Sequence, residues 1–146
     1  MTVVNGYEQS DAEKKLNILN LPSLADEAKK IIPTGGYGYI VGGSEDEWTL
    51  AENTKAFNHA QIVPKALSNI DSPDLSTNFL GIDLKTPIMM APTAAQGLAH
   101  SQGEKDTARG VAAVGGLMAQ STYSSTSIAD TAAAGHGAPQ VCPLYM

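Results

Sequence analysis

Pro87-Ile88-Met89-Met90-Ala91-Pro92 is an apolar run without alternation, and it decides the expected fold class. Such a run is typical of a strand buried on both faces, as in a parallel sheet. Ser101-Gln102-Gly103-Glu104 has the spacing of a capping box and predicts a helix that ends at Gly115-Gly116. Residues 117–121 form a second candidate strand, 127–134 a helix and 140–146 a third strand. The order β-α-β-α-β predicts a parallel sheet with right-handed crossovers.

The residues before this sheet predict helices and a hairpin. A helix is expected over 23–32, capped by Ser23 and ended by Pro33 and Gly35-Gly36. A second helix is expected from Glu45 to about Asn58, and residues 77–84 indicate a hairpin that turns at Gly81. We therefore divide the chain into an N-terminal helical segment, 1–74, and a strand-helix segment, 75–146.

Charge and composition exclude several classes of protein. The 146 residues carry a net charge of −6 and a single arginine, Arg109, which argues against nucleic acid as a partner. Cys142 is the only cysteine, so a disulfide within the chain is impossible, and the default is an inert buried thiol. The start lacks the pattern of a signal peptide, and no apolar stretch approaches the ~20 residues of a membrane span. We expect a soluble, cytoplasmic protein.

Gly35-Gly36-Tyr37-Gly38-Tyr39-Ile40-Val41-Gly42-Gly43 invites comparison with a phosphate-binding loop. The third glycine comes one place too late for G-x-G-x-x-G, and a helix rather than a strand precedes it. The interpretation we prefer is a glycine-relieved turn with Tyr37 and Tyr39 packed onto a core. The three histidines, His59, His100 and His136, have no metal-ligand spacing, so we expect no metal site.

Several stretches together resemble the FMN-dependent 2-hydroxy-acid oxidases, from about residue 20 to the last residue. The segment 33–40 and, after it, 46–49 and 53–57 resemble the helical N-terminal part of that family. Residues 87–100 resemble its first barrel strand and the loop after it, and 107–109, 121–124 and 144–146 continue in register. Asp46-Glu47-Trp48-Thr49 and Gly97-Leu98-Ala99-His100 look closer to bacterial lactate oxidases than to plant glycolate oxidases. The resemblance implies an incomplete (β/α)8 TIM barrel that is entered through a helical segment.

The resemblance also implies roles for eight residues. One side of the flavin would be lined by four consecutive residues, Pro92, Thr93, Ala94 and Ala95, and Ser121 would hydrogen-bond its pyrimidine part. Tyr39 and Tyr145 would donate hydrogen bonds to the substrate carboxylate, and Tyr123 would lie near the substrate entrance. Without the resemblance, each alanine or serine would be assigned to ordinary strand packing. Buried structural tyrosines remain the alternative for Tyr39 and Tyr145.

One position departs from the family pattern. Pro143 stands where the family has a glutamine that hydrogen-bonds the flavin, and proline has neither a side-chain amide nor a backbone N–H. The loss of one such bond would cost about 0.5–1.5 kcal/mol of binding. The segment from Gln140 to Cys142 also lacks the aromatic character of the family.

The chain is expected to be too short for the whole enzyme, because a (β/α)8 barrel takes about 250 residues and its phosphate site follows strands 7 and 8. The family's catalytic histidine, its aspartate partner, the substrate-binding arginine and the lysine near the flavin would lie beyond Met146. In enzymes of the family the histidine removes a proton from the 2-hydroxyl, and hydride passes to the flavin. Dioxygen then reoxidises the flavin, and the products are a 2-oxo acid and hydrogen peroxide. The chain alone would be inactive, without a catalytic base, and we expect Met146 to abut a complementary chain or a second copy.

Two other interpretations stay open at this point. The chain is either a truncation product that folds by self-association and has lost flavin chemistry, or a small α/β binding domain unrelated to the family. Pro143 and the absent phosphate site favour the first of these for the isolated chain, whereas Tyr39, Ser121 and Tyr145 favour the oxidase.

Overall fold

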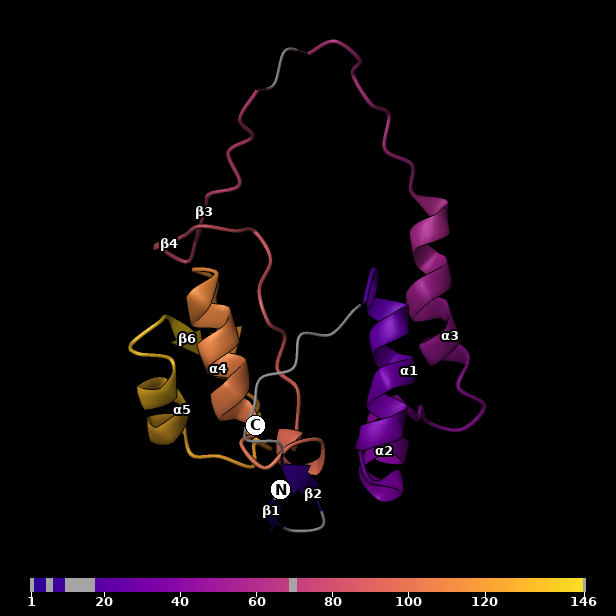
Figure 1. Ribbon diagram of the computed structural model, residues 1–146. Coiled ribbons are helices and arrows are strands. Elements are labelled where there is room, and N and C mark those ends of the chain that lie inside the picture. Colours follow the sequence, from indigo (N-terminus) through magenta and orange to yellow (C-terminus); the bar gives the residue numbers. More distant parts are fainter. Residues whose placement is uncertain (1, 5–6, 10–17, 69–70, 146) are drawn as a thin grey trace.

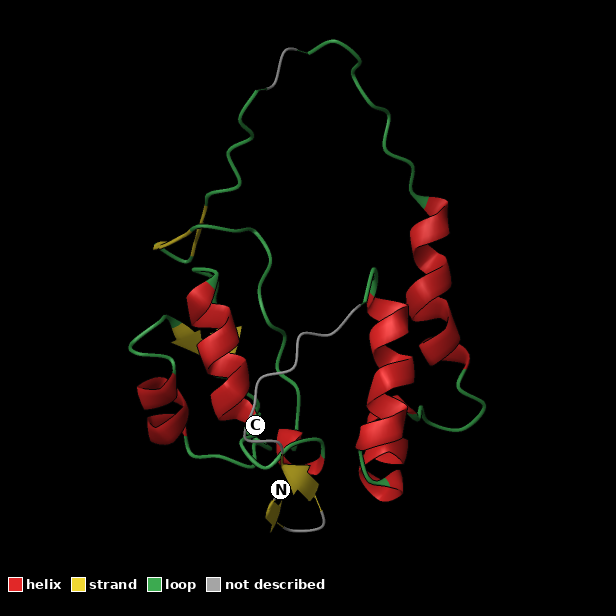
Figure 2. Ribbon diagram, viewed as in Figure 1, coloured by secondary structure: helices red, strands yellow, loops and turns green. Residues whose placement is uncertain are grey.

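The computed structural model describes residues 2–4, 7–9, 18–68 and 71–145 of the chain. Helices α1, α2 and α3 form one group of elements and a small α/β unit forms another (Figures 1 and 2). Ahead of both, β1 (Thr2–Val4) pairs antiparallel with β2 (Tyr7–Gln9), a hairpin that the sequence did not predict. Met146, which was expected to abut another polypeptide, lies outside the described residues.

The first helix, α1 (Leu21–Ile31), begins earlier than predicted. Its cap is Asn20, whose Oδ1 accepts the backbone N–H of Ser23 at 2.9 Å, so the assignment of Ser23 as the cap was wrong. Pro22 lies in the first turn, where its missing N–H costs no hydrogen bond. Asparagine is as good a cap as serine, and the helix therefore starts at the earlier residue.

The glycine-rich stretch forms a helix, α2 (Thr34–Val41), and the predicted turn was wrong. Gly36 is buried, and a Cβ on it would lie 2.4 Å from the carbonyl oxygen of Leu98. The glycine therefore allows a helix to approach another backbone closely. Tyr39 does not pack onto a core either, because 58% of it is exposed.

The next elements follow the prediction more closely. The expected second helix is α3 (Trp48–Lys55), continued by a 3₁₀ turn, η1 (Ala56–His59). The expected hairpin consists of β3 (Thr77–Phe79) and β4 (Ile82–Leu84) in antiparallel register. Leu80 and Gly81, between the strands, both have positive φ, as a tight two-residue hairpin turn requires.

Three parallel segments form the sheet that the sequence predicted. Met90 is bridged to β5 (Met118–Ala119), and β5 pairs with β6 (Gln140–Val141), all parallel. The N–H of Met90 donates to the carbonyl of Leu117 at 2.9 Å, and that of Gln120 donates to Val141 at 2.8 Å. Two crossover helices, α4 (Glu104–Ala113) and α5 (Ile128–Ala134), pack against each other. The order β-α-β-α-β is confirmed, although the strands are much shorter than expected.

The two crossover helices begin differently. Ser127 was predicted as the first residue of this helix and is instead its cap, since its Oγ accepts the N–H of Asp130 at 3.1 Å. The capping box at Ser101 was wrong, because α4 begins after Gly103, at φ 45°, and Gly103 makes no side-chain cap. The side chain of Glu104 is used elsewhere.

The described residues bury little apolar surface. The buried hydrophobic side chains are Leu84, Ala108, Leu117 and Met118. The accessible surface is 11555 Å², whereas a compact monomer of this mass would expose roughly 7,100 Å². Trp48, Phe57 and Ile62 are at least 72% exposed. Within the part of the chain that is described, no helix has the length and apolarity to cross a membrane.

Candidate functional site

Three loops leave the carboxyl edge of the parallel sheet. One follows Met90 and carries residues 91–95, the second follows β5 and carries residues 120–124, and the third follows β6 and carries residues 142–145. The backbone N–H of Ala95 donates to the carbonyl of Tyr123 at 2.9 Å, which joins the first loop to the second. The sequence-predicted flavin residues and two of the three tyrosines therefore lie on loops that leave the same edge of the sheet.

The predicted flavin residues differ in exposure. Pro92 and Thr93 are exposed, whereas Ala94 and Ala95 are half-buried. Ser121 is 8% exposed, and its Oγ accepts the backbone N–H of Tyr123 at 3.0 Å. Among the described residues, the hydroxyl of Ser121 acts as an acceptor and not as a donor.

The three predicted substrate tyrosines are exposed, Tyr39 by 58%, Tyr123 by 79% and Tyr145 by 77%. The alternative of buried structural tyrosines is therefore wrong for Tyr39 and Tyr145. Cys142 is exposed as well, contrary to the buried thiol we expected. Pro143, the departure from the family pattern, lies half-buried two residues after β6.

A cavity of about 300 Å³ lies between Ile40, near the end of α2, and the loop after the first strand. Its walls include Ile40 of α2, Thr93 and Ala94 of that loop, and His100, whose Nδ1 lies 3.0 Å from Asp106. Tyr39 is the neighbour of Ile40 but is not itself in the wall. No lysine or arginine lines this cavity, although His100 and Gly103, the residue that precedes α4, do.

Glu104 is the residue of this region that sequence reasoning missed. It is fully buried, and its Oε1 accepts two backbone N–H groups, that of Gln96 at 3.1 Å and that of Ser125 at 2.9 Å. The capping-box spacing drew attention to Glu104 for the wrong reason. A signal that the sequence does offer is the i, i+4 spacing of Glu104 and Ala108, which places this glutamate on the buried face of α4.

The ionisation of Glu104 reflects two opposed effects. Burial raises the pKa of its carboxyl, but hydrogen bonds from the N–H groups of Ser125, Glu104 itself and Gln96 lower it by more. The net pKa lies below the ordinary value. Oε2 has no hydrogen bond of good geometry among the described residues, although the Thr126 hydroxyl is near enough to favour the charged form. Glu104 is therefore a buried carboxylate at neutral pH.

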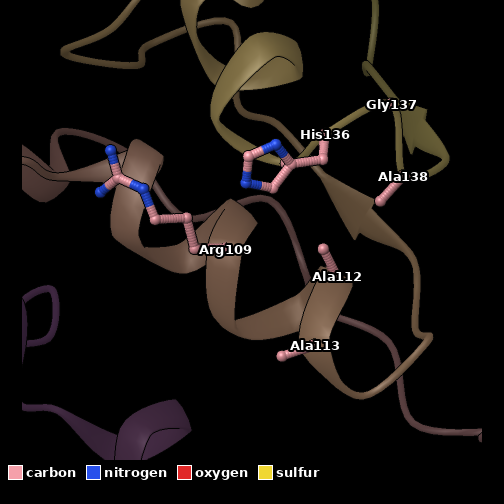
Figure 3. A pocket seen from close by; sticks show the side chains of 7 residues that line it. Arg109, Ala112, Ala113, His136, Gly137 and Ala138 are labelled. Atoms are coloured by element: carbon pink, nitrogen blue, oxygen red, sulfur yellow. The ribbon is translucent and has the colours of Figure 1, made fainter.

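A larger cavity, about 560 Å³, lies between α4 and the loop after α5 (Figure 3). Arg109 and His136 extend along it, and the rest of its lining is alanine and glycine. Ala113 and Ala138 of this lining precede β5 and β6, so this cavity lies toward the amino ends of the strands. Arg109 is also paired with Asp106. In the described part of the chain, no cluster of side chains suits a metal ion.

The comparisons with known proteins identify the family. The model of the FMN-dependent dehydrogenases matches residues 28–146. The chain belongs to this family. FMN is the cofactor of the family, and the expectation drawn from the sequence resemblance is confirmed.

Individual relatives show how similar the chain is to particular oxidases. The chain is 72% identical over its whole length to an L-lactate oxidase of Lentilactobacillus hilgardii, of which it covers 40%. It is 40% identical over 120 residues to glycolate oxidase 1 of Zea mays, of which it covers 32%. Among solved structures, a protein of Pediococcus acidilactici described as a lactate oxidase superposes with a TM-score of 0.90 at 71% identity. That superposition covers 99% of this chain and 40% of the other.

The chain thus spans between 32% and 40% of the length of these relatives. A flavocytochrome b2 variant superposes with a TM-score of 0.83 at 29% identity, again over only 35% of its own length. The structural neighbours are FMN-dependent barrel oxidases, so the chain is a partial α/β barrel.

The described residues fit one part of FMN and not another. Small side chains and a free hydroxyl at the strand ends suit the edge of a flat ring system, because Ala94, Ala95 and Ser121 let donors approach it closely. The doubly charged phosphate needs cations or a helix N-terminus, and the cavity beside this edge has no lysine or arginine in its walls. Among the described residues, those at this edge therefore suit the ring, and no lysine or arginine in the cavity beside them suits the phosphate.

Proposed function

We propose that the chain is the N-terminal part of an FMN-dependent (S)-2-hydroxy-acid oxidase that acts on L-lactate or a similar acid. The observation that carries the proposal is the gathering of 91–95, 120–124 and 142–145 at the carboxyl edge of a parallel sheet, the edge at which barrel enzymes place their active sites. The high identity to an L-lactate oxidase supports this substrate class.

In this proposal the chain's residues bind and orient. Pro92, Thr93, Ala94 and Ala95 form one side of the ring site, and Ser121 donates its hydroxyl proton to the pyrimidine part. Bound FMN would supply the hydride-accepting chemistry that turns the hydroxy acid into a 2-oxo acid, with dioxygen as the final electron acceptor and hydrogen peroxide as the second product.

The three tyrosines bind the substrate in this proposal. Tyr39 and Tyr145 donate their hydroxyl protons to the substrate carboxylate, and Tyr123 lies at the entrance to the site. Their exposure leaves the hydroxyl groups available to a ligand.

The proposal includes a complementary polypeptide that supplies the catalytic base and the remaining strands, either as a second chain or as a continuation of this one. The edge of the sheet at Met90 has no partner strand among the described residues. Beside it, an apolar groove of about 310 Å³ is lined by Ile88, Met89, Val111 and Val114, of which Ile88 is 78% exposed. Unpaired edges and bare apolar faces are what a further strand and helix would cover. The assembly that contains both parts is called the complete oxidase below.

The test is to purify the chain with and without the complementary polypeptide and to add L-lactate under anaerobic conditions. We expect the complete oxidase to show flavin absorbance that L-lactate bleaches, and the chain alone to show none. If the preparations with and without the complementary polypeptide are both colourless, the proposal is wrong. Flavin that is bound but never bleached would favour the second candidate, a non-catalytic chain that folds by association. Two observations support this candidate: no lysine or arginine lines the cavity beside the ring site, and Pro143 replaces the glutamine of the family.

A further inference from the structure

We propose that Glu104 is a positioning residue, which holds the loop after the first strand and the loop after β5 in the arrangement that receives ring and substrate. The inference rests on the proposed function, because those loops carry Ala94, Ala95, Ser121 and Tyr123. Glu104 itself touches neither substrate nor cofactor in this proposal.

The hydrogen bonds around Glu104 connect both loops to α4. Oε1 of Glu104 accepts the N–H of Gln96 from one loop, at 3.1 Å, and that of Ser125 from the other, at 2.9 Å. The Oγ of Ser125 accepts the N–H of Gly97 at 2.9 Å, and Oε1 of Gln96 accepts the hydroxyl of Thr107 at 2.5 Å. We call this set, Glu104, Gln96, Gly97, Thr107 and Ser125, the clasp.

Burial and charge make Glu104 the centre of the clasp. Its side chain is 0% exposed, so water cannot replace the two N–H groups that it accepts. Hydrogen bonds to an ionised acceptor are roughly twice as strong as neutral ones. Ser125 and Thr107 are both more exposed than Glu104, and their bonds are therefore easier to exchange with solvent.

The clasp also holds a strained residue of the ring site. Ala95 has φ 49° and ψ 44°, a left-handed conformation that a residue with a Cβ adopts at a cost. Its own N–H is bound to Tyr123, and the next N–H along the chain is bound to Glu104. These two bonds fix the backbone on either side of Ala95. Without Glu104 the bond to Tyr123 and the bond from the Leu98 N–H to the Ala95 carbonyl, at 2.9 Å, would remain, and we expect Ala95 to be held less firmly in the left-handed region.

Two glycines let the clasp close. A Cβ on Gly97 would lie 2.7 Å from the Oγ of Ser125, and a Cβ on Gly103 would lie 3.1 Å from the N of Gly97. The two loops and the start of α4 therefore come together at van der Waals limits. A small displacement of the Glu104 side chain would therefore displace both loops.

The experiment compares E104A, E104Q and the exposed-carboxylate control D26A in the complete oxidase. The amide oxygen of glutamine can accept the same two N–H groups, so E104Q should keep the FMN dissociation constant and KM within about threefold. E104A loses both acceptors, and both constants should rise at least about tenfold. D26A should leave both unchanged. Hydrogen exchange supplies a readout other than activity: peptides 94–100 and 121–127 should exchange about tenfold faster in E104A, while α1 and α3 keep their rates.

The outcomes separate this inference from the proposed function. If wild-type complete oxidase binds no flavin that L-lactate bleaches, the proposed function fails, and the exchange experiment still tests the clasp. If wild type is bleached while E104A keeps its KM, FMN affinity and loop exchange, Glu104 positions nothing. Loss of function in E104A and E104Q alike, with faster exchange throughout the protein, would show a general structural role and would also overturn the proposal.

Discussion

At the scale of single residues, the buried carboxylate of Glu104 is the feature with the clearest thermodynamic consequence. An anion that is hydrogen-bonded only in the folded state binds its proton less tightly there than in the unfolded chain. Because the pKa of Glu104 is lowered on folding, from an ordinary value of 4.5, its contribution to stability is present above that value. The contribution is lost as the pH falls through the lower pKa of the folded state.

We therefore expect wild-type complete oxidase to have a larger free energy of unfolding than E104Q at pH 6, and the difference to shrink below about pH 4.5. Urea unfolding of both proteins between pH 3.5 and 7, repeated at steps of about one pH unit, measures this difference. Since the glutamine does not titrate, an unchanged difference across this range would contradict the assignment of the titration to Glu104.

At the scale of elements, α2 is defined by what it approaches. Gly36 faces the backbone of Leu98, whereas a Cβ on Gly38 of the same helix would meet nothing within 4 Å. The two glycines therefore differ in packing and share the same low helix propensity. This makes them a matched pair for asking whether α2 is held by propensity or by contact with the loop.

G38A should raise the free energy of unfolding of the complete oxidase by about 0.5–1 kcal/mol, the propensity gain from glycine to alanine. G36A should lower it by about 1–3 kcal/mol, because the methyl group must push a helix away from a carbonyl oxygen. Chemical denaturation of the two variants beside wild type gives both values. Equal stabilisation by both substitutions would mean that α2 does not pack on Leu98 in solution.

The same element shows where sequence reasoning succeeds and where it stops. Strand order and the hairpin turn depend on local patterns, namely the apolar runs and the glycine at position 81, and these were predicted. The helix at α2 depends on a contact with residues about 60 positions away, which no local pattern contains, and local propensity pointed to a turn. The bonds of Glu104 were missed for the same reason, because a capping spacing cannot reveal that a side chain turns toward Ser125.

At the scale of the whole molecule, the chain exposes more surface than a compact monomer of the same mass would. Large apolar side chains such as Trp48, Phe57 and Ile88 are at least 72% exposed. The apolar groove beside Met90 adds to this surface. Hydrophobic burial is roughly proportional to the area removed from water, so a large stabilisation remains to be gained by association.

We expect the isolated chain to self-associate, to bind an environment-sensitive apolar dye, and to lose both properties when the complementary polypeptide is added. Sedimentation velocity and dye fluorescence measure the two effects. A monodisperse, dye-free monomer with a cooperative thermal transition would contradict this expectation.

The clasp also has a consequence for the order in which the protein is made. All its bonds join residues between Gln96 and Ser125, and the longest connects positions 28 apart. A ribosome therefore releases every partner of Glu104 within a short interval, well before a final strand would be available to close a barrel at Met90. Contacts of short sequence separation form early, and N-terminal units fold first during synthesis. The two loops of the proposed site can thus be set in place before any strand that follows Ser125 in the sequence has left the ribosome.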